Sequence, residues 1–337
     1  MKYTALVILN YNNYEDTFSC IESVERFNTS PIKFIIVDNG STRKDSVNII
    51  DKYLKKRFFD SYQKIIVGNN YPSVLKYCSF LINPVNEGYA NGNNQALKLI
   101  ENDNTIENIL ILNNDVIFVE DIIPRLLQQK KELTDCAIIS PALYVKDLTD
   151  YDYTCARKAP SAWDLILECL MLGLNINSYR KKIKNKYWLF INNPELKKSK
   201  LIEIEMPSGS CMLINKQLFK EIGYFDSHTF LYFEENILYA KIYGKGLKNY
   251  LMPQLKCIHL GAESTKRSKG YFIQKCGLES RCLYLEKYCN LTNKEKVIFF
   301  LAKRIQYFKI EILKLLKKIN WFFDIFISCS FDNSVRC

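Results

Sequence analysis

Three short apolar segments in the first third of the chain each end abruptly in polar residues. Residues 4–9, 34–37 and 109–112 are dominated by Ile, Val and Leu, and Asn or Asp follows each at once. Uninterrupted apolar runs of this length predict strands buried on both faces in a parallel sheet. In open α/β sheets, ligands bind outside the carboxyl ends of such strands. The pattern therefore predicts a polar ligand-binding crevice at one edge of the sheet.

The first half of the chain alternates between strand-like and helix-like segments. A further strand is expected over residues 78–82, and residues 58–77, with Gly68 and Pro72, predict an insertion loop. Helices are expected over residues 14–27, 45–56, 89–101 and 121–133. This alternation predicts the α/β class, with a mostly parallel central sheet flanked by helices.

The second half of the chain breaks this alternation. Residues 146–200 are rich in Lys, Tyr and Asn and predict either an insertion above the substrate site or a solvated, charged loop. A strand over 203–215, helices over 216–222 and 235–243 and a strand over 250–260 are expected after it. We expect one domain over residues 1–265 and a helical region over residues 266–337.

The C-terminal region from about residue 290 has the pattern of an amphipathic helix. On a helical wheel one face carries apolar residues, namely Leu301, Ile305, Phe308, Ile312, Leu315, Leu316, Ile319, Phe323 and Phe326. Lys303, Lys314, Lys317 and Lys318 lie on the opposite face. No run of roughly 18 uncharged apolar residues exists, so a membrane-spanning helix is not expected. The pattern favours a helix lying in a membrane interface, and packing of the apolar face on the domain is the alternative.

Composition narrows the classes of partner. A net charge of +11 favours an anionic partner: nucleic acid, anionic lipid or a phosphorylated substrate. No RRM, KH or helix-turn-helix signature is present, so nucleic acid is not expected. The twelve cysteines form no CxxC pair and no regular spacing, which predicts neither a zinc site nor a disulfide framework and favours a reducing cytosol.

Two adjacent carboxylates, Glu234 and Glu235, add possible acid–base chemistry to the predicted crevice. Strand ends that supply oxygen ligands, combined with such a pair, indicate an enzyme. The motifs are LVILNYNN at 6–13, IIVDNGST at 35–42, NEGYANGNNQAL at 86–97, LNNDV at 112–116, PSGSCMLINKQLFKEIGYFD at 207–226, FLYFEENIL at 230–238 and CIHLGAEST at 257–265.

In this combination the chain resembles the inverting family 2 glycosyltransferases, which have the GT-A fold, over residues 4–265. Within that family it is most similar to the branch that builds rhamnose-containing and other bacterial surface polysaccharides. The resemblance implies transfer of a sugar from a nucleotide-diphosphate sugar to a hydroxyl of a growing glycan, presented on a polyprenyl diphosphate. It also implies a cytoplasmic enzyme, peripheral at the inner face of the bacterial plasma membrane.

The resemblance assigns donor-binding roles residue by residue. The Asp38 carboxylate matches the family residue that binds the base or ribose of the nucleotide. The other implied donor-binding residues are Asn10, Asn12, Asn86, Gly88, Asn91, Asn113, Asn114 and Gly209.

The resemblance also implies a divalent metal, Mg²⁺ or Mn²⁺, at the donor diphosphate. Asp115 matches the last carboxylate of the family DxD motif, whose first acid is replaced here by Asn113. His259 lies in a segment that meets the metal or the diphosphate in the family.

The general base of the family matches Glu235, with Glu234 beside it. The chain departs from the family pattern because Glu235 replaces an Asp and Ile237 replaces a further acid. The missing acids at Asn113 and Ile237 leave a non-catalytic sugar-nucleotide-binding protein as one alternative. A nucleotidyltransferase is another, although the segment after the first strand lacks the Gly-rich phosphate loop of that class.

Overall fold

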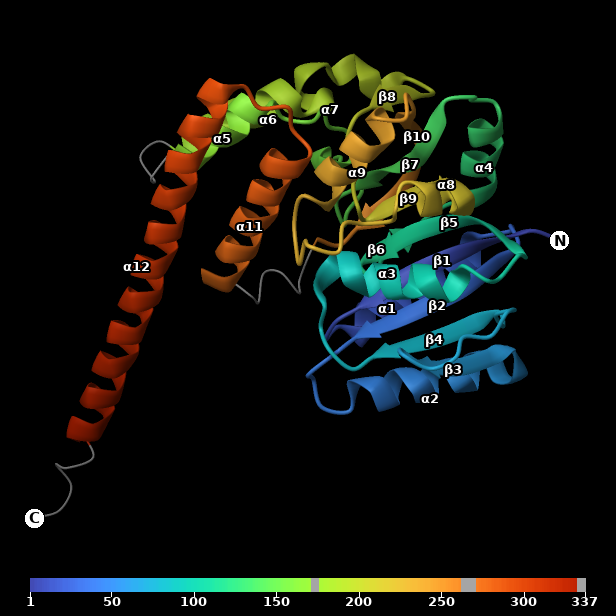
Figure 1. Ribbon diagram of the computed structural model, residues 1–337. Helices are drawn as coiled ribbons and strands as arrows, with labels where there is room; N and C mark the ends of the chain where they lie inside the picture. The colour runs from blue at the N-terminus through green and yellow to red at the C-terminus, as the bar shows by residue number, and fades with distance from the viewer. Residues whose placement is uncertain (171–175, 262–270, 332–337) are drawn as a thin grey trace, which may run out of the picture.

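The computed structural model describes residues 1–170, 176–261 and 271–331, which form a ten-stranded mixed sheet with helices on both faces (Figure 1). In spatial order the strands are β3 (Tyr62–Ile66), β4 (Cys78–Asn83), β2 (Ile32–Asn39), β1 (Tyr3–Asn10), β5 (Ile106–Asn113), β9 (Cys211–Asn215), β7 (Cys136–Tyr144), β10 (Lys248–His259) and β6 (Val116–Phe118), and β8 (Ile202–Ile204) also pairs with β10. Within the described chain only β9, β6 and β8 run against the common direction. The predicted α/β class with a mostly parallel central sheet is confirmed.

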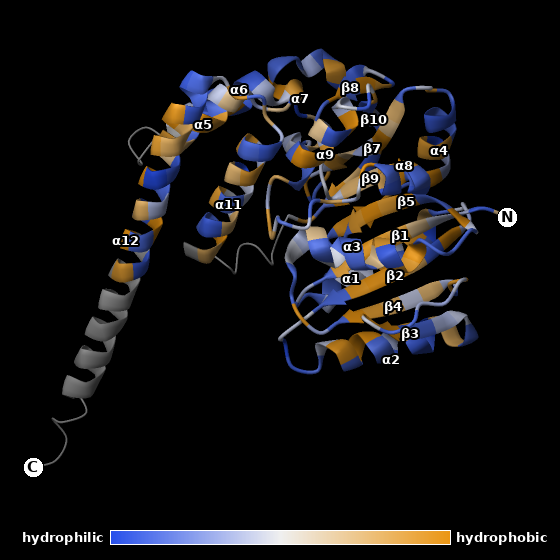
Figure 2. Ribbon diagram, viewed as in Figure 1, coloured by the Kyte–Doolittle hydropathy of each residue, from blue (hydrophilic) through white to orange (hydrophobic). Residues whose placement is uncertain are grey.

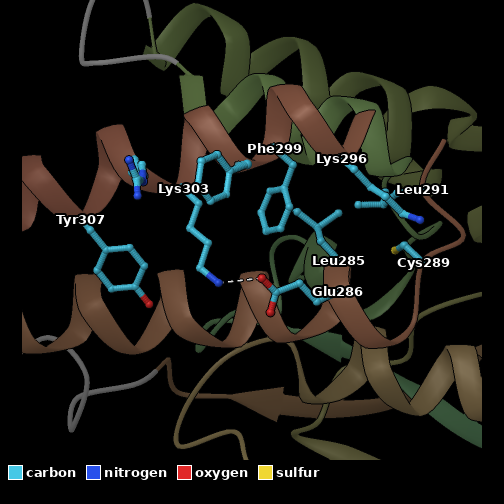
Figure 3. Close-up of a pocket in the computed structure, with 10 residues that line it drawn as sticks. Leu285, Glu286, Cys289, Leu291, Lys296, Phe299, Lys303 and Tyr307 are labelled. Carbon is cyan, nitrogen blue, oxygen red and sulfur yellow. Dashed lines mark hydrogen bonds and ion pairs between the residues drawn. The ribbon is translucent and has the colours of Figure 1, made fainter. Parts of the chain in front are cut away.

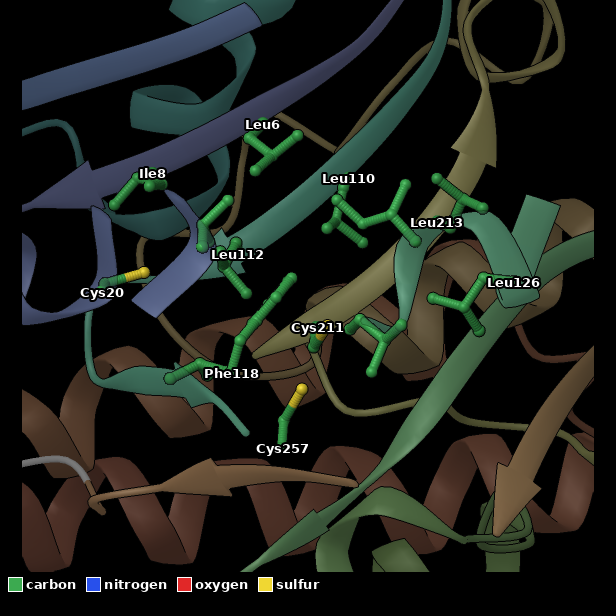
Figure 4. Close-up of a cluster of buried hydrophobic side chains, with 14 of the residues drawn as sticks. Leu6, Ile8, Cys20, Leu110, Leu112, Phe118, Leu126, Cys211, Leu213 and Cys257 are labelled. Carbon is green, nitrogen blue, oxygen red and sulfur yellow. The ribbon is translucent and has the colours of Figure 1, made fainter. Parts of the chain in front are cut away.

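Residue alternation along the strands builds a core on each side of the sheet. In β1, Leu6 and Ile8 belong to one core, while Ala5 and Val7 belong to the other. The first core is covered by α1 (Tyr14–Phe27), α2 (Ser46–Phe58), α4 (Ile123–Lys131) and α7 (Leu189–Asn192). The second is covered by α3 (Gly88–Ile100), α8 (Lys216–Glu221) and α9 (Glu234–Tyr243). Figure 4 shows part of the first core, where Leu6, Leu110 and Leu213 of three strands lie together.

Three segments of the chain differ in the structure from what the sequence predicts. The insertion loop expected over residues 58–77 is wrong in part, because β3 forms a parallel edge strand there. The single strand expected over 203–215 is also wrong, because β8 and β9 are separated by a loop at Pro207 and Gly209. The strand β7 was not expected, although all nine of its residues are buried.

Residues 146–200 are largely helical rather than a solvated loop, so that alternative is wrong for the described part of the segment. They form α5 (Ala162–Leu170), α6 (Ile176–Tyr187) and α7, with the 3-10 turns η2 (Tyr153–Cys155) and η3 (Pro194–Lys198). A third core joins α5 to α11 (Tyr271–Lys287) and α12 (Asn293–Phe331), because Ile166, Leu285 and Ala302 are buried together. The expected domain boundary at 265/266 lies outside the described residues.

Helix α12 runs beside α5 and α11 and then extends away from the sheet (Figures 1 and 2). Its packed face includes Phe299, Ala302 and Ile310, whereas Leu301 and Phe308 of the predicted apolar face are 54% and 69% exposed. The alternative that this apolar face packs on the domain is therefore wrong for these two residues. The side chains of residues 316–331 lie outside those described. Among the described residues, no helix is long and apolar enough to cross a membrane.

Candidate active site

The carboxyl ends of β1, β2 and β5 lie in register at one edge of the sheet. Asn10 is paired with Asp38 across β1 and β2, and Leu9 is paired with Asn113 across β1 and β5. The polar residues that end these three strands are therefore neighbours in space. This edge is where the sequence predicts the ligand-binding crevice.

Asp38 is fully buried and holds the loops after β1 and β2 together. Its Oδ2 accepts hydrogen bonds from Asn10 Nδ2 at 2.8 Å and Ser41 Oγ at 2.7 Å, and its Oδ1 accepts from Ser41 N at 3.0 Å. Asn10 is also fully buried, and its Oδ1 accepts from Thr17 Oγ1. Both residues thus set the backbone at the mouth of the crevice.

Asn12 joins the same two loops from outside. It adopts a left-handed backbone conformation with φ of 58°, which Asn tolerates better than most residues. Its Oδ1 accepts hydrogen bonds from the backbone N–H groups of Thr42 and Arg43, at 2.8 and 2.7 Å. This side chain is committed to fixing the loop after β2.

A cavity of about 370 Å³ lies beside these strand ends. Its lining includes Tyr11, Asn39, Asn86, Gly88, Asn113 and Asn114. Four of the predicted donor-binding residues therefore lie on one cavity. Asn91 does not line it, because its Nδ2 donates to the backbone carbonyl of Ser227.

Gly88 is required where α3 begins. Its φ of +82° is in the left-handed region, and a Cβ there would lie 2.1 Å from the Phe230 carbonyl oxygen. Asn39 reinforces this turn because its Nδ2 donates to the Gly88 carbonyl and to Asn86 Oδ1. Sequence reasoning did not select Asn39, although it lies within the IIVDNGST segment.

Asp115 and His259 meet at the end of β5 and β10. The His259 Nε2 lies 3.4 Å from Asp115 Oδ2, and the Leu260 N–H donates to the Asp115 carbonyl. The opposite ring nitrogen, His259 Nδ1, lies 2.7 Å from Asp152 Oδ2. Asp152 comes from the loop before η2, 107 residues away in the chain, and no local pattern in the sequence marks it.

The two carboxylates determine the ionisation of this histidine. Burial alone would lower the pKa of His259, but hydrogen bonds to Asp115 and Asp152 outweigh it and raise the pKa to about 10. Burial would raise the pKa of Asp152, yet hydrogen bonds from His259 and Thr154 lower it to about 2. The site thus concentrates negative charge around one imidazole.

Two consecutive residues, Gly209 and Ser210, connect this cluster to the predicted base. Gly209 N–H donates to Glu235 Oε1 at 3.0 Å, and Ser210 Oγ lies 3.2 Å from His259 Nε2. Asn113 Nδ2 also donates to Ser210 Oγ at 3.1 Å. A Cβ on Gly209 would lie 3.1 Å from Glu235 Oε1 and 2.9 Å from the Tyr89 hydroxyl. The loop that separates β8 from β9 therefore contacts both the predicted base, Glu235, and the predicted metal ligand His259.

Glu234 and Glu235 occupy different environments although they are adjacent. Glu235 remains partly accessible, with a side chain 23% exposed, and its Oε1 lies 3.7 Å from Arg157 Nη2. Glu234 is buried, and its Oε1 has no hydrogen-bond partner among the described residues. Burial, and then the charge of Glu235, raise the pKa of Glu234 to about 8. Glu235 is thus the carboxylate that a substrate can reach.

The backbone before this pair is strained. Tyr232 and Phe233 both have left-handed φ values, 73° and 68°, which large aromatic residues rarely adopt. Phe233 immediately precedes α9, so this geometry sets the direction in which Glu234 and Glu235 leave the loop. Strain of this kind persists where surrounding structure enforces it, commonly at functional sites.

Comparison with known proteins identifies the family. Residues 5–223 match the family described as Glycosyl transferase family 2. The chain belongs to this glycosyltransferase family. Its match spans the strand ends, the Asp115 turn and the Gly209 loop, whereas Glu235 and His259 lie beyond it.

A curated relative and a solved structure show what this family 2 chain is similar to. The low-salt glycan biosynthesis hexosyltransferase Agl10 of Haloferax volcanii is 26% identical over 60% of the chain and 58% of its own length. The crystal structure of GalNAc-T7 with UDP, GalNAc and Mn²⁺ has a TM-score of 0.53 at 14% identity, over 77% of the chain and 44% of its own length. The chain therefore spans about half the length of these two proteins. The structural likeness confirms the expected GT-A fold.

Proposed function

We propose that this glycosyltransferase carries out inverting transfer of a hexose or deoxyhexose from a nucleotide-diphosphate sugar to an acceptor hydroxyl. The acceptor in this proposal is a growing bacterial surface polysaccharide carried on a polyprenyl diphosphate. Support comes from the family match, from the hexosyltransferase name of the Haloferax relative and from the UDP in the structural neighbour.

The observation that carries the proposal is the bridge made by Gly209 and Ser210. Gly209 contacts Glu235, and Ser210 lies beside His259 of the Asp115 cluster and accepts a hydrogen bond from Asn113, which lines the first cavity. In the proposed reaction Glu235 removes the proton from the acceptor hydroxyl as its oxygen attacks the anomeric carbon. One displacement with departure of the nucleoside diphosphate inverts the anomeric configuration, and no covalent enzyme intermediate is needed.

The donor set at Asp115 fits a hard divalent cation, Mg²⁺ or Mn²⁺. Such ions bind through one or two carboxylates together with phosphate oxygens of a substrate, so Asp115 would supply a carboxylate ligand, and His259 would join it through Nε2 once that nitrogen has lost its proton. No cluster of three His, Cys, Asp or Glu suited to a metal occurs among the described residues. A bound cation would neutralise charge on the departing diphosphate.

Transfer assays with purified protein test this function. A panel of dTDP-, UDP- and GDP-sugars with Mn²⁺ or Mg²⁺ should yield transfer or slow donor hydrolysis with at least one donor. NMR of the product should show the opposite anomeric configuration from the donor, and EDTA should abolish transfer. A retained configuration, or full activity in EDTA, would contradict the mechanism.

We further propose that α12 holds the enzyme on an anionic membrane surface. Phe300, Leu301, Phe308 and Leu315 are all more than half exposed, and the last three recur every seven residues along the helix. An apolar stripe that no described element covers can enter the headgroup region, while flanking lysines meet anionic lipid.

The structure changes the choice of variant for this test. Deleting α12 would uncover the third core, since Phe299 and Ala302 are buried in it. The double variant Leu301→Gln/Phe308→Gln removes exposed apolar groups only. It should lose sedimentation with anionic vesicles, while Lys314→Gln, on the opposite face of α12, should keep most of it. Absence of vesicle binding by the native chain, or concentration-dependent dimerisation through this stripe, would contradict the membrane proposal.

A further inference from the structure

A second cavity, of about 660 Å³, opens beside Glu235 on the side of α5, α6, α11 and α12. Its charged lining consists of Arg157, Arg180, Arg281, Lys309, Glu168 and Glu235. Four cations face two carboxylates, so the cavity carries an excess of positive charge. The remaining lining includes Tyr232, Phe233 and Leu278. This cavity is therefore distinct in character from the neutral, asparagine-lined cavity at the strand ends.

Two of these arginines have unused hydrogen-bonding capacity. The Nε–H groups of Arg157 and Arg281 are buried and have no acceptor among the described residues. Arg281 is otherwise fixed, because its Nη2 lies 3.3 Å from Glu168 Oε2 and its guanidinium lies over the Phe233 ring at 5.6 Å. Because the Nε atoms are inaccessible, a ligand in the cavity would contact other atoms of these side chains, which are 19% and 20% exposed for Arg157 and Arg281.

The acceptor side of the reaction is the natural place for this ligand, because Glu235 lines the same cavity. We propose that the cavity binds the phosphate or diphosphate group of the acceptor, an inference that rests on the proposed function. Guanidinium groups match phosphate oxygens in geometry and charge. The volume suits a small ligand, about one or two sugars with a phosphate. The acceptor therefore carries its charge close to the reacting hydroxyl, which places this transfer early in the assembly of a lipid-linked glycan.

Helix α12 also lines the second cavity, in addition to its proposed role at the membrane. Lys309 is half-buried and faces the cavity, and Gln306, which also lines it, donates to the Cys169 carbonyl of α5. On the other side of the α11–α12 pair, an apolar groove of about 640 Å³ contains Leu285, Phe299 and Tyr307, with Lys303 paired to Glu286 (Figure 3). The same two helices thus line both a cationic cavity and an apolar groove.

Binding of farnesyl diphosphate in EDTA tests the cavity directly, because EDTA excludes any metal-dependent diphosphate binding at Asp115. Arg180→Ala and Lys309→Ala change partly exposed cations and should each weaken binding about tenfold. Lys184→Ala and Lys314→Ala are controls on the same two helices outside the cavity lining, and they should bind as the native chain does. Farnesol should not bind. Binding of inorganic diphosphate as tight as that of farnesyl diphosphate would assign the site to phosphate alone, and tighter farnesyl diphosphate would assign it to a lipid-linked phosphate.

A transfer assay separates this inference from the proposed function. A single sugar on a prenyl diphosphate should have a lower KM than the same sugar as a neutral glycoside, and Arg180→Ala should raise only the first KM. Equal use of both acceptors, or farnesyl diphosphate binding that ignores Arg180 and Lys309, would overturn the cavity assignment while leaving glycosyl transfer intact. Phosphate binding at this cavity without transfer from any sugar nucleotide would overturn the proposed function instead.

Discussion

Replacing Glu234 with Gln should change how the stability of the protein depends on pH. Glu234 is 5% exposed and adjacent to Glu235, and these two causes raise its pKa from 4.5 to about 8. The folded chain therefore holds this proton at pH values where the unfolded chain has released it. The protonated Glu234 side chain therefore contributes its full stabilisation of the folded wild type below pH 4.5, and this stabilisation is lost as the pH rises from 4.5 through 8.

The size of the effect follows from the same shift. One pKa unit corresponds to about 1.4 kcal/mol, so this group alone should lower the free energy of unfolding by about 3 kcal/mol between pH 5 and pH 8. Gln has the shape of the neutral acid and does not titrate. Between pH 5 and pH 8, the free energy of unfolding of Glu234→Gln minus that of the wild type should therefore rise by about 3 kcal/mol.

Urea denaturation of both proteins at half-unit steps from pH 5 to pH 8.5 measures this difference. All other titrating groups are shared, so subtracting one profile from the other isolates Glu234. Glu221→Gln, which removes an exposed acid on α8, is the matched control for replacing Glu with Gln. Parallel profiles for Glu234→Gln and the wild type would show that the buried carboxyl is ionised at neutral pH, and the reasoning would be refuted.

Two further predictions concern catalysis and the core. Glu235→Gln should reduce turnover roughly 10²–10⁴-fold with little change in donor affinity, measured by steady-state kinetics and nucleotide titration. If Glu234→Gln loses turnover and Glu235→Gln keeps it, Glu234 is the base instead. Asp103→Ala should lower the free energy of unfolding by roughly 3–5 kcal/mol, because it leaves buried Lys33 without the carboxylate 2.8 Å away. The control Glu195→Ala, in an exposed ion pair, should change the free energy of unfolding by less than about 1 kcal/mol. Similar urea midpoints for the two variants would contradict this prediction.

The elements that the sequence predicts well are those with long apolar runs. The segments around Ile8, Ile36 and Leu112 are buried strands that pair in parallel, as expected. The edge strand β3 was missed because only Ile65 of its five residues is buried, so its hydrophobic signal is weak. The strand β7 was missed because Pro141 interrupts it, and its partner β10 accommodates a register shift at that point.

In the site too, residues inside recognisable sequence motifs could be predicted, and residues that act through partners distant in the chain could not. Asp115, Glu235 and Gly209 lie in segments whose sequence resembles the family, and the structure brings them together. Asp152 and Arg157 could not be selected, because their partners His259 and Glu235 are distant in the chain and nothing nearby marks them. The sequence thus predicts the candidate base and metal ligand, and it does not predict the distant residues Asp152 and Arg157 that contact His259 and Glu235.

The segment of residues 146–200 has a consequence for exchanging parts between related enzymes. It would be the obvious piece to transplant in order to alter acceptor choice, since its helices cover one side of the second cavity. Yet it also supplies Asp152, which orients His259, and Arg157, whose guanidinium donates to the Pro207 carbonyl beside the Gly209 loop. A chimaera that replaces the whole segment would disturb the donor side together with the acceptor side. A graft confined to α5 and α6 leaves both of these residues in place, but it has to preserve Leu165, Ile166 and Cys169, which α5 contributes to the third core.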